Sequence, residues 1–197
     1  MSTSKLTLNV QSEIGKLEAV MLHYPGPEVE NMTPKNAQRA LYSDILNLSI
    51  AQKEYAQLKG VLEKTSLVYK VSDLLEKVLE IPGQRLSLLQ KICVTEQVED
   101  YFDYLLELSS SQLTKILIEG LPMQVKTLTD FLKEEYYALQ PLYNFYFTRD
   151  TSVTIGNTSL VCKMANTVRM RESVIMDAIF NSGLFFNGKI TNMYDAS

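Results

Sequence analysis

Two short stretches of the sequence carry the side chains best suited to chemistry. In the first, residues 144–150 read Asn-Phe-Tyr-Phe-Thr-Arg-Asp, so the Asp150 carboxylate follows an aromatic-rich segment, 143–147, that we predict to be a strand. A carboxylate walled by apolar rings is costly unless it meets a cation, and a ligand's guanidinium, bound in a planar two-bond fork, is such a cation. Alternatively, Asp150 caps the next turn or pairs with Arg149, and the residues alone favour this second interpretation.

The second stretch, residues 168–172, reads Val-Arg-Met-Arg-Glu. If it is extended, Arg169 and Arg171 share one face, because side chains two apart in a strand point the same way. Either guanidinium could then bind the carboxylate of a ligand. Arginines of this kind more often form salt bridges with surface carboxylates, and the sequence alone leaves both readings open.

The histidine and the cysteines are weaker candidates. His23 is the single histidine, and a general base needs a positioned partner that the sequence does not supply, so we expect a structural hydrogen bond at a strand end. Cys93 lies on an apolar helix face and Cys162 in an alternating strand, which predicts two core thiols and no disulfide. One histidine cannot build a zinc site of clustered His and Cys, and we expect no metal and no cofactor.

Composition excludes several functional classes. The 197 residues are 46% hydrophobic and 21% charged, which is typical of a globular protein with a real core. The net charge of -4, with no basic cluster, argues against nucleic acid as a partner. No apolar run is long enough to cross a bilayer and the first ten residues do not read as a secretory signal, so we expect a cytoplasmic protein with no membrane partner.

The elements that must position these residues alternate between strand and helix patterns. Residues 17–23 predict a buried strand, and Thr33-Pro34 predicts the start of a short helix. Ser49 and Gln52 form a capping-box pattern for a second helix that ends near Lys64, before a strand at 67–71. Strand, helix and strand in this order predict an α/β fold.

A block of amphipathic helices follows, and strand signals return after Pro141. We therefore predict two α/β parts, 1–71 and 137–197, separated by a helical insertion at 72–136. The expected helices of the insertion lie at 73–80, 85–93, 96–108 and 112–119, with Gly120 and Pro122 as stop signals. Further on, we expect a hairpin that turns at Gly156-Asn157, with alternating strands before and after the turn, and a helix at 172–180.

Taken together, several motifs resemble those of arginine deiminases. Phe147-Thr148-Arg149-Asp150, then Gly156-Asn157, then 168–172 carry the resemblance, and Ile14-Gly15-Lys16-Leu17, Pro25-Gly26 and Thr33-Pro34 match in order upstream. The resemblance covers residues 6–71 and 139–180, with the helical block where this family has an insertion. It implies the α/β propeller, or pentein fold, of the guanidino-group modifying enzymes, here a partial propeller with an inserted small α-helical domain.

The resemblance also assigns roles to individual residues. It implies that Asp150 binds the substrate guanidinium and is the catalytic residue of this chain, and that Asn144 and Phe147 line the pocket. Arg169 matches the arginine that holds the α-carboxylate of the substrate. Leu41 matches a pocket leucine, although Tyr42-Ser43-Asp44 follows it where Phe-Asp-Asp is more common.

Family chemistry is covalent hydrolysis of L-arginine to L-citrulline and ammonia through a cysteine nucleophile, helped by a histidine. The corresponding late Cys, His-x-Asp and Glu-Gly-Gly-Asp motifs have no match in this sequence, and neither Cys93, Cys162 nor His23 replaces them. The resemblance therefore implies an N-terminal portion of an arginine deiminase, inactive alone but able to bind L-arginine, as a homo-oligomer or with a complementary C-terminal half. The alternatives are a non-catalytic arginine-binding or assembly protein of the same fold, and a related amidinotransferase or dimethylarginine hydrolase.

Overall fold

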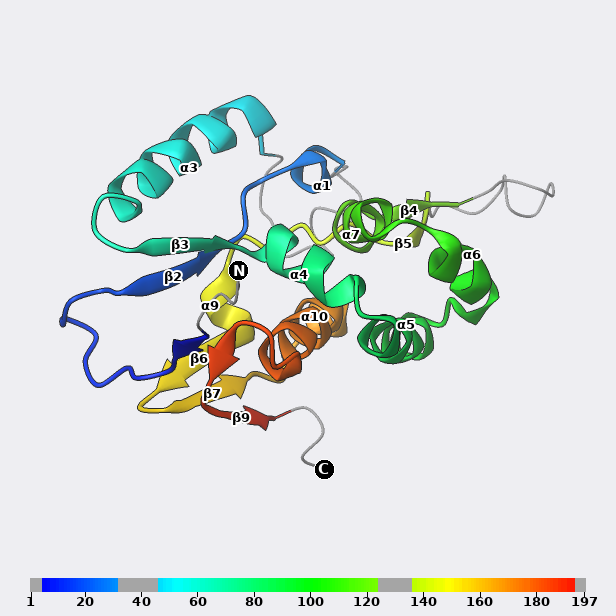
Figure 1. Cartoon of the computed structure of the whole chain (residues 1–197). Coiled ribbons are helices and arrows are strands. Elements are labelled where there is room, and N and C mark those ends of the chain that lie inside the picture. Colours follow the sequence, from blue (N-terminus) through cyan, green and yellow to red (C-terminus); the bar gives the residue numbers. More distant parts are fainter. Residues whose placement is uncertain (1–4, 32–45, 124–135, 194–197) are drawn as a thin grey trace.

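The structure is a computed structural model and describes residues 5–31, 46–123 and 136–193. It is a mixed α/β fold with several small sheets (Figure 1). The mixture of helices and strands confirms the α/β class. The strands described form no closed barrel, so the propeller remains a prediction. Within the described ranges, no helix is both long and apolar enough to span a membrane.

The first α/β unit consists of β2 (Ala19–Leu22), α3 (Leu48–Leu62) and β3 (Leu67–Lys70). The two strands are parallel, with Ala19 opposite Leu67 and Leu22 opposite Lys70, which confirms the predicted strand-helix-strand order. The short β1 (Leu6–Thr7) and α1 (Pro27–Glu30) flank this unit in sequence. The helix predicted to begin at Thr33-Pro34 lies outside the described residues.

The predicted cap of α3 is wrong by two residues. Asn47 is the N-cap, because its Oδ1 accepts a hydrogen bond from the backbone N of Ile50 at 3.2 Å. Ser49 lies inside the helix and its hydroxyl donates to the same Asn47 oxygen at 2.7 Å. Asparagine and serine are both good N-caps, so residue type alone does not distinguish Asn47 from Ser49 as the start of the helix.

Residues 71–119 form a helical block, in the region where the sequence predicts an insertion at 72–136. It comprises α4 (Val71–Leu79), α5 (Pro82–Glu96), the 3-10 turn η1 (Glu99–Tyr101), α6 (Phe102–Glu107) and α7 (Ser110–Glu119). A reciprocal capping box between Ser109 and Gln112 starts α7. Gly120 ends it with φ of 92°, and a Cβ there would lie 2.8 Å from the Leu139 carbonyl oxygen, so glycine is required.

The second α/β part, predicted at 137–197, begins with β5 (Tyr137–Leu139), which pairs antiparallel with β4 (Leu121–Pro122), a short strand inside the predicted insertion at 72–136. It continues through α9 (Thr148–Thr151), β6 (Ser152–Ile155), β7 (Thr158–Val161), η2 (Thr167–Arg169), α10 (Met170–Asn181), β8 (Phe186–Asn187) and β9 (Lys189–Asn192). The hairpin of β6 and β7 is confirmed, and β9 adds to β7 in parallel. β8 pairs with β1, which joins the two ends of the described chain.

The predicted strand at 143–147 is wrong. The segment is a series of turns closed by short-range bonds, from Phe145 N to the Leu142 oxygen at 3.2 Å and from Phe147 N to the Asn144 oxygen at 3.0 Å. Turns let the Phe145 ring, fully buried, pack inward while Phe147 stays 46% exposed. Aromatic residues favour strands only when a partner strand supplies the ladder, and local bonds satisfy this backbone instead.

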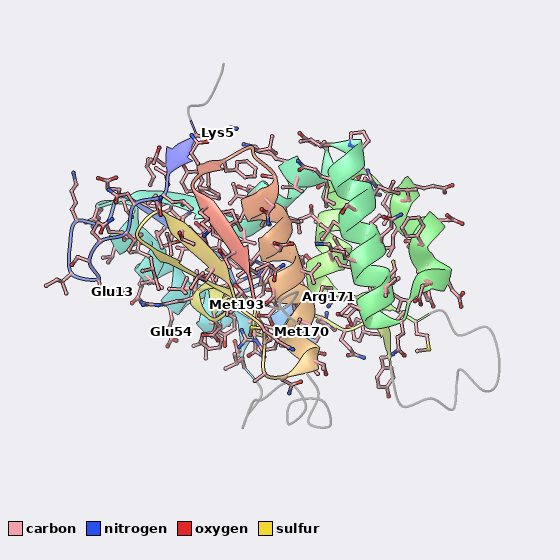
Figure 2. All side chains as sticks on the ribbon, turned by 90° about the horizontal axis from the view of Figure 1, so that it is seen from below. Lys5, Glu13, Glu54, Met170, Arg171 and Met193 are labelled. Carbon is pink, nitrogen blue, oxygen red and sulfur yellow. The ribbon has the colours of Figure 1, made fainter. Side chains whose placement is uncertain are left out.

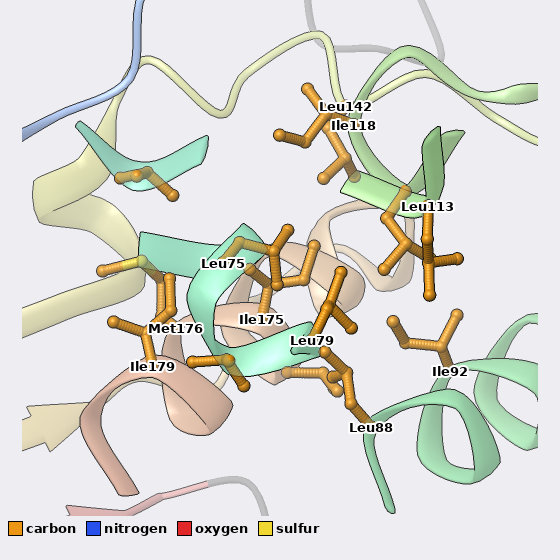
Figure 3. Close-up of a cluster of buried hydrophobic side chains, with 14 of the residues drawn as sticks. Leu75, Leu79, Leu88, Ile92, Leu113, Ile118, Leu142, Ile175, Met176 and Ile179 are labelled. Atoms are coloured by element: carbon orange, nitrogen blue, oxygen red, sulfur yellow. The ribbon is translucent and has the colours of Figure 1, made fainter. Parts of the chain in front are cut away.

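A single apolar cluster connects the helical block with the second α/β part (Figure 3). Leu75 and Leu79 of α4 lie between Ile175 and Ile179 of α10 on one side and side chains of α5 and α7 on the other. Both leucines are essentially without solvent exposure. Because α10 carries Arg169 at its N-terminal end, the helical block supports the segment in which the candidate site lies. The division into domains stays a prediction.

Candidate functional site

The turns at 143–147 and the single helical turn of α9 position Asp150. The backbone N of Asp150 donates to the Phe147 oxygen at 3.1 Å, and the Thr148 hydroxyl donates to the Met21 oxygen at 3.1 Å, which attaches α9 to β2. The fully buried Thr151 returns a hydrogen bond to the Thr148 oxygen at 2.8 Å. Asp150 therefore stands on a hydrogen-bonded helical turn that is attached to β2 of the first α/β unit.

Arg169 reaches the same place from the N-terminus of α10. Asn166 starts the preceding turn by accepting a hydrogen bond from Val168 N at 3.0 Å, and Arg169 follows as the residue before α10. Its guanidinium Nη1 donates to Asp150 Oδ2 at 2.8 Å, and Nη2 donates to the Asn144 backbone oxygen at 3.4 Å. The structure thus brings together Asn144, Asp150 and Arg169, three of the residues predicted for the site.

Glu172, three residues after Arg169, completes this group. Arg169 Nε donates to Glu172 Oε1 at 3.1 Å and to Oε2 at 3.2 Å, and Nη2 donates to Oε2 at 2.8 Å. We call Asp150, Arg169 and Glu172 the charge cluster. Glu172 lies inside the motif at 168–172, and the sequence alone assigns it no role. Its spacing of three from Arg169 at a helix start is the signal that could have found it.

The electrostatics of the charge cluster follow from burial. Burial raises the pKa of Glu172, whose side chain is 2% exposed, and the hydrogen bonds and charge of Arg169 oppose that rise without cancelling it. Burial acts to lower the pKa of Arg169, but Glu172 and then Asp150 outweigh it, so the pKa of this guanidinium is raised. Arg169 is therefore charged at every relevant pH, and its charge is matched from two sides.

Several expectations about Asp150 need correction. Its partner is Arg169, not Arg149, which instead forms an exposed pair with Glu13 at 3.0 Å. The side chain of Asp150 is 48% exposed, so it is not walled by aromatic rings. The Tyr146 and Phe147 rings pack on each other, with centroids 4.3 Å apart, beside the turn. The exposed carboxylate and the exposed Phe147 leave Asp150 open to a ligand from solvent.

The two arginines of the second motif do not share a face, because the segment is helical, not extended. Arg171 lies at the start of α10 (Figure 2). Its Nη2 donates to the backbone oxygen of Gln140, just after β5, and its Nε lies 3.7 Å from Glu96 Oε1 at the end of α5 in the helical block. It is 1% exposed, and burial lowers its pKa. Arg171 is a structural residue that connects α10 to the helical block, and a ligand cannot reach it.

His23 has the structural role expected. Its Nε2 lies 3.0 Å from Glu28 Oε1, both side chains are buried, and the Phe145 ring covers the imidazole with centroids 4.9 Å apart. Cys93 is buried as predicted, whereas Cys162 is only partly buried. Burial raises the pKa of both thiols, and the Asp150 charge adds to the rise at Cys162.

Two remaining predictions concern a residue and a metal. Leu41 lies outside the described residues, so the structure does not test its place in the pocket. In the ranges that are described, no three His, Cys, Asp or Glu side chains gather in a way that could hold a metal ion.

Comparison with known proteins decides the family. The family model for arginine deiminase matches residues 38–196, which is more than half of the chain. The chain belongs to the arginine deiminase family. The arginine deiminases of Streptococcus pneumoniae strain P1031 and of serotype 4 strain ATCC BAA-334 / TIGR4 are each 32% identical to it over 205 residues. These alignments cover 95% of this chain and 50% of each relative, so the chain spans about half the length of the curated relatives it matches.

Asp150 and Arg169 both lie in the part of the chain that the family model matches, and they contact each other directly. The resemblance assigns them to opposite ends of one substrate, yet they bind each other at 2.8 Å. The length of the arginine side chain separates its guanidinium from its carboxylate. Under that assignment, one arginine could not bridge the two groups while they touch each other.

Proposed function

We propose that the chain is the substrate-binding, N-terminal portion of an arginine deiminase, which converts L-arginine and water to L-citrulline and ammonia. In this proposal Asp150 binds the guanidinium of arginine and Arg169 binds its α-carboxylate, while Asn144, Phe147 and Leu41 line the pocket. The single observation that carries it is the contact between the side chains of Asp150 in α9 and Arg169 in η2. Both residues lie in the part of the chain that the arginine deiminase family model matches.

Arginine binds by exchange of ion pairs. The guanidinium of the ligand replaces Arg169 on Asp150, and the carboxylate of the ligand replaces Asp150 on Arg169. Each protein charge keeps a partner throughout, so the exchange avoids the large cost of leaving a charge unpaired in a partly buried site. The 48% exposure of the Asp150 side chain gives the ligand access to the pair.

The chain alone has no deiminase activity in this proposal. Covalent hydrolysis needs a thiolate nucleophile, and burial raises the pKa of Cys162 and of Cys93, which keeps both as thiols near neutral pH. His23 is engaged by Glu28 and shielded by Phe145. Catalysis therefore requires a complementary C-terminal half that supplies the nucleophile and closes the α/β propeller over Asp150.

The test combines a binding and an activity measurement. Isothermal titration with L-arginine should show binding by the wild-type chain and none by Asp150→Ala, while Arg149→Ala, a neighbouring and exposed cation, should bind like wild type. Citrulline formation should be absent from the chain alone and should appear on co-expression with the C-terminal half of the Streptococcus pneumoniae enzyme. Citrulline produced by the pure chain, and abolished by Asp150→Ala, would refute the proposed inactivity.

Three outcomes separate the remaining interpretations. Arginine binding with no activity under any pairing would indicate a non-catalytic arginine-binding protein of the same fold. Activity without binding by the isolated chain would indicate that the second half is needed to form the pocket. Absence of both would sink the proposed function.

A further inference from the structure

The guanidinium of Arg169 presents two edges with different partners. The edge formed by Nε and Nη2 meets both carboxylate oxygens of Glu172, at 3.1, 3.2 and 2.8 Å. On the opposite edge Nη1 donates to Asp150 at 2.8 Å. Nη2 also reaches the backbone oxygen of Asn144 at 3.4 Å. The planar fork of an arginine can bind one carboxylate along one edge and still offer the other edge to a second carboxylate.

The two partners differ in how easily a ligand could displace them. The Glu172 side chain is 2% exposed and stands on α10 next to the apolar cluster, whereas the Asp150 side chain is 48% exposed. A buried carboxylate that loses its cation leaves an uncompensated charge, so the contact between Glu172 and Arg169 is expensive to break. The contact between Asp150 and Arg169 is open to solvent and is the one that a ligand can exchange.

We propose that Glu172 is a positioning residue that holds Arg169 by its Nε edge, so that the Nη1 edge faces the ligand and donates to its α-carboxylate in place of Asp150. Glu172 itself touches no ligand. The inference deepens the proposed function and rests on it for the identity of the ligand. The orientation of Arg169 is a separate physical property, and it can be measured without any ligand.

The first experiment measures that orientation by NMR of the arginine side chains. The Nε–H of Arg169 should give a resolved signal in the wild-type chain with exchange at least tenfold slower than that of the exposed Arg149, because it is bonded to a buried carboxylate. Glu172→Gln should shift the signal and speed its exchange, since an amide offers one acceptor oxygen where the carboxylate offers two. Asp150→Asn is the matched control and should leave the signal in place, because Asp150 binds Nη1.

Two results of that experiment would overturn the inference. One is an Arg169 Nε–H that exchanges as fast as that of Arg149. This result comes from the wild-type chain alone and does not depend on whether a variant folds. The other is a signal unchanged in folded Glu172→Gln, with folding checked by circular dichroism.

The second experiment asks whether the position matters for ligand choice. Dissociation constants are measured for L-arginine and for agmatine, which has the guanidinium but no carboxylate. The wild-type chain should prefer arginine, and Glu172→Gln should reduce that preference about tenfold while the affinity for agmatine stays the same. An unchanged preference would overturn the inference. If the wild-type chain binds neither ligand, the proposed binding of arginine by the isolated chain fails, and the NMR result still decides whether Glu172 orients Arg169.

Discussion

The helical block and the charge cluster lie side by side on α10 but are stabilised by different forces. In the block, amphipathic helices bury leucines such as Leu75, Leu89 and Leu117 with no exposed surface. In the charge cluster, a nearly buried arginine is held between one buried and one exposed carboxylate. Apolar packing is insensitive to pH and has one best arrangement, whereas an ion pair with one exposed partner can exchange that partner. We therefore expect the helical block to be rigid and the charge cluster to be the region that responds to a ligand.

The largest effect that separates the two regions should come from Arg169→Met. Removing the guanidinium leaves Glu172 buried without its cation, which costs about 3–5 kcal/mol in the free energy of unfolding. The loss should also depend on pH. Burial already raises the pKa of Glu172, and without Arg169, which opposes the rise, the folded-state pKa moves further above the unfolded value. Stability should therefore be highest below the unfolded pKa and fall as pH rises through the folded pKa.

Urea denaturation of Arg169→Met and of the wild-type chain between pH 4 and pH 8 measures this effect. The difference between the two should be small at the acid end and should widen toward neutral pH. A difference in the free energy of unfolding that is constant with pH would show that Arg169 stabilises the fold by packing, as the leucines of the helical block do. The two regions would then not differ in the forces that stabilise them.

Leu75→Ala should show the contrasting behaviour. Leu75 of α4 is fully buried where α4 packs on α7 and α10. Its truncation should lower the free energy of unfolding by about 2–5 kcal/mol through lost burial and a residual cavity. The loss should be equal at pH 4 and pH 8, because no titratable group is involved. Val94→Ala, at a position 66% exposed on α5, is the control and should change stability by less than about 0.5 kcal/mol.

These two regions also differ in how far the sequence predicts them. Periodic leucines and the stop at Gly120 were enough to place α4, α5 and α7 close to their observed bounds. The strand at 143–147 was wrong because its aromatic residues have a high strand propensity, while local turn bonds, which depend on the backbone path, decide its conformation. Propensity does not reveal whether a partner strand is available.

For the charge cluster, composition and spacing give only candidates. Asp150 and Arg169 are 19 residues apart (169 − 150) and lie on different elements, so the family resemblance, not periodicity, pointed to both. Their direct contact depends on how α9 and α10 approach each other, which no local pattern encodes. Glu172 is different, because residues three apart in a helix are neighbours on its surface, so the start of α10 alone brings Glu172 next to Arg169. The prediction of an extended segment at 168–172 hides this contact.

The smallest predicted effect concerns Cys162, which reports the charge of Asp150. That charge adds to burial in raising the pKa of the Cys162 thiol. Asp150→Asn should lower this pKa and increase the rate of alkylation by iodoacetamide at pH 8 by about twofold, because more thiolate is present. Cys93, 2% exposed and influenced by Glu99 instead, should react slowly and equally in both proteins. Equal Cys162 rates would show that Asp150 carries no effective charge at this position.

The central claim is that Asp150 and Arg169 exchange each other for the two ends of one arginine, and the most direct measurement is a titration of the wild-type chain, Asp150→Ala and Arg149→Ala with L-arginine. The account predicts heat of binding for the wild-type chain and for Arg149→Ala, and none for Asp150→Ala. Equal binding by all three proteins, or binding by none, would contradict it.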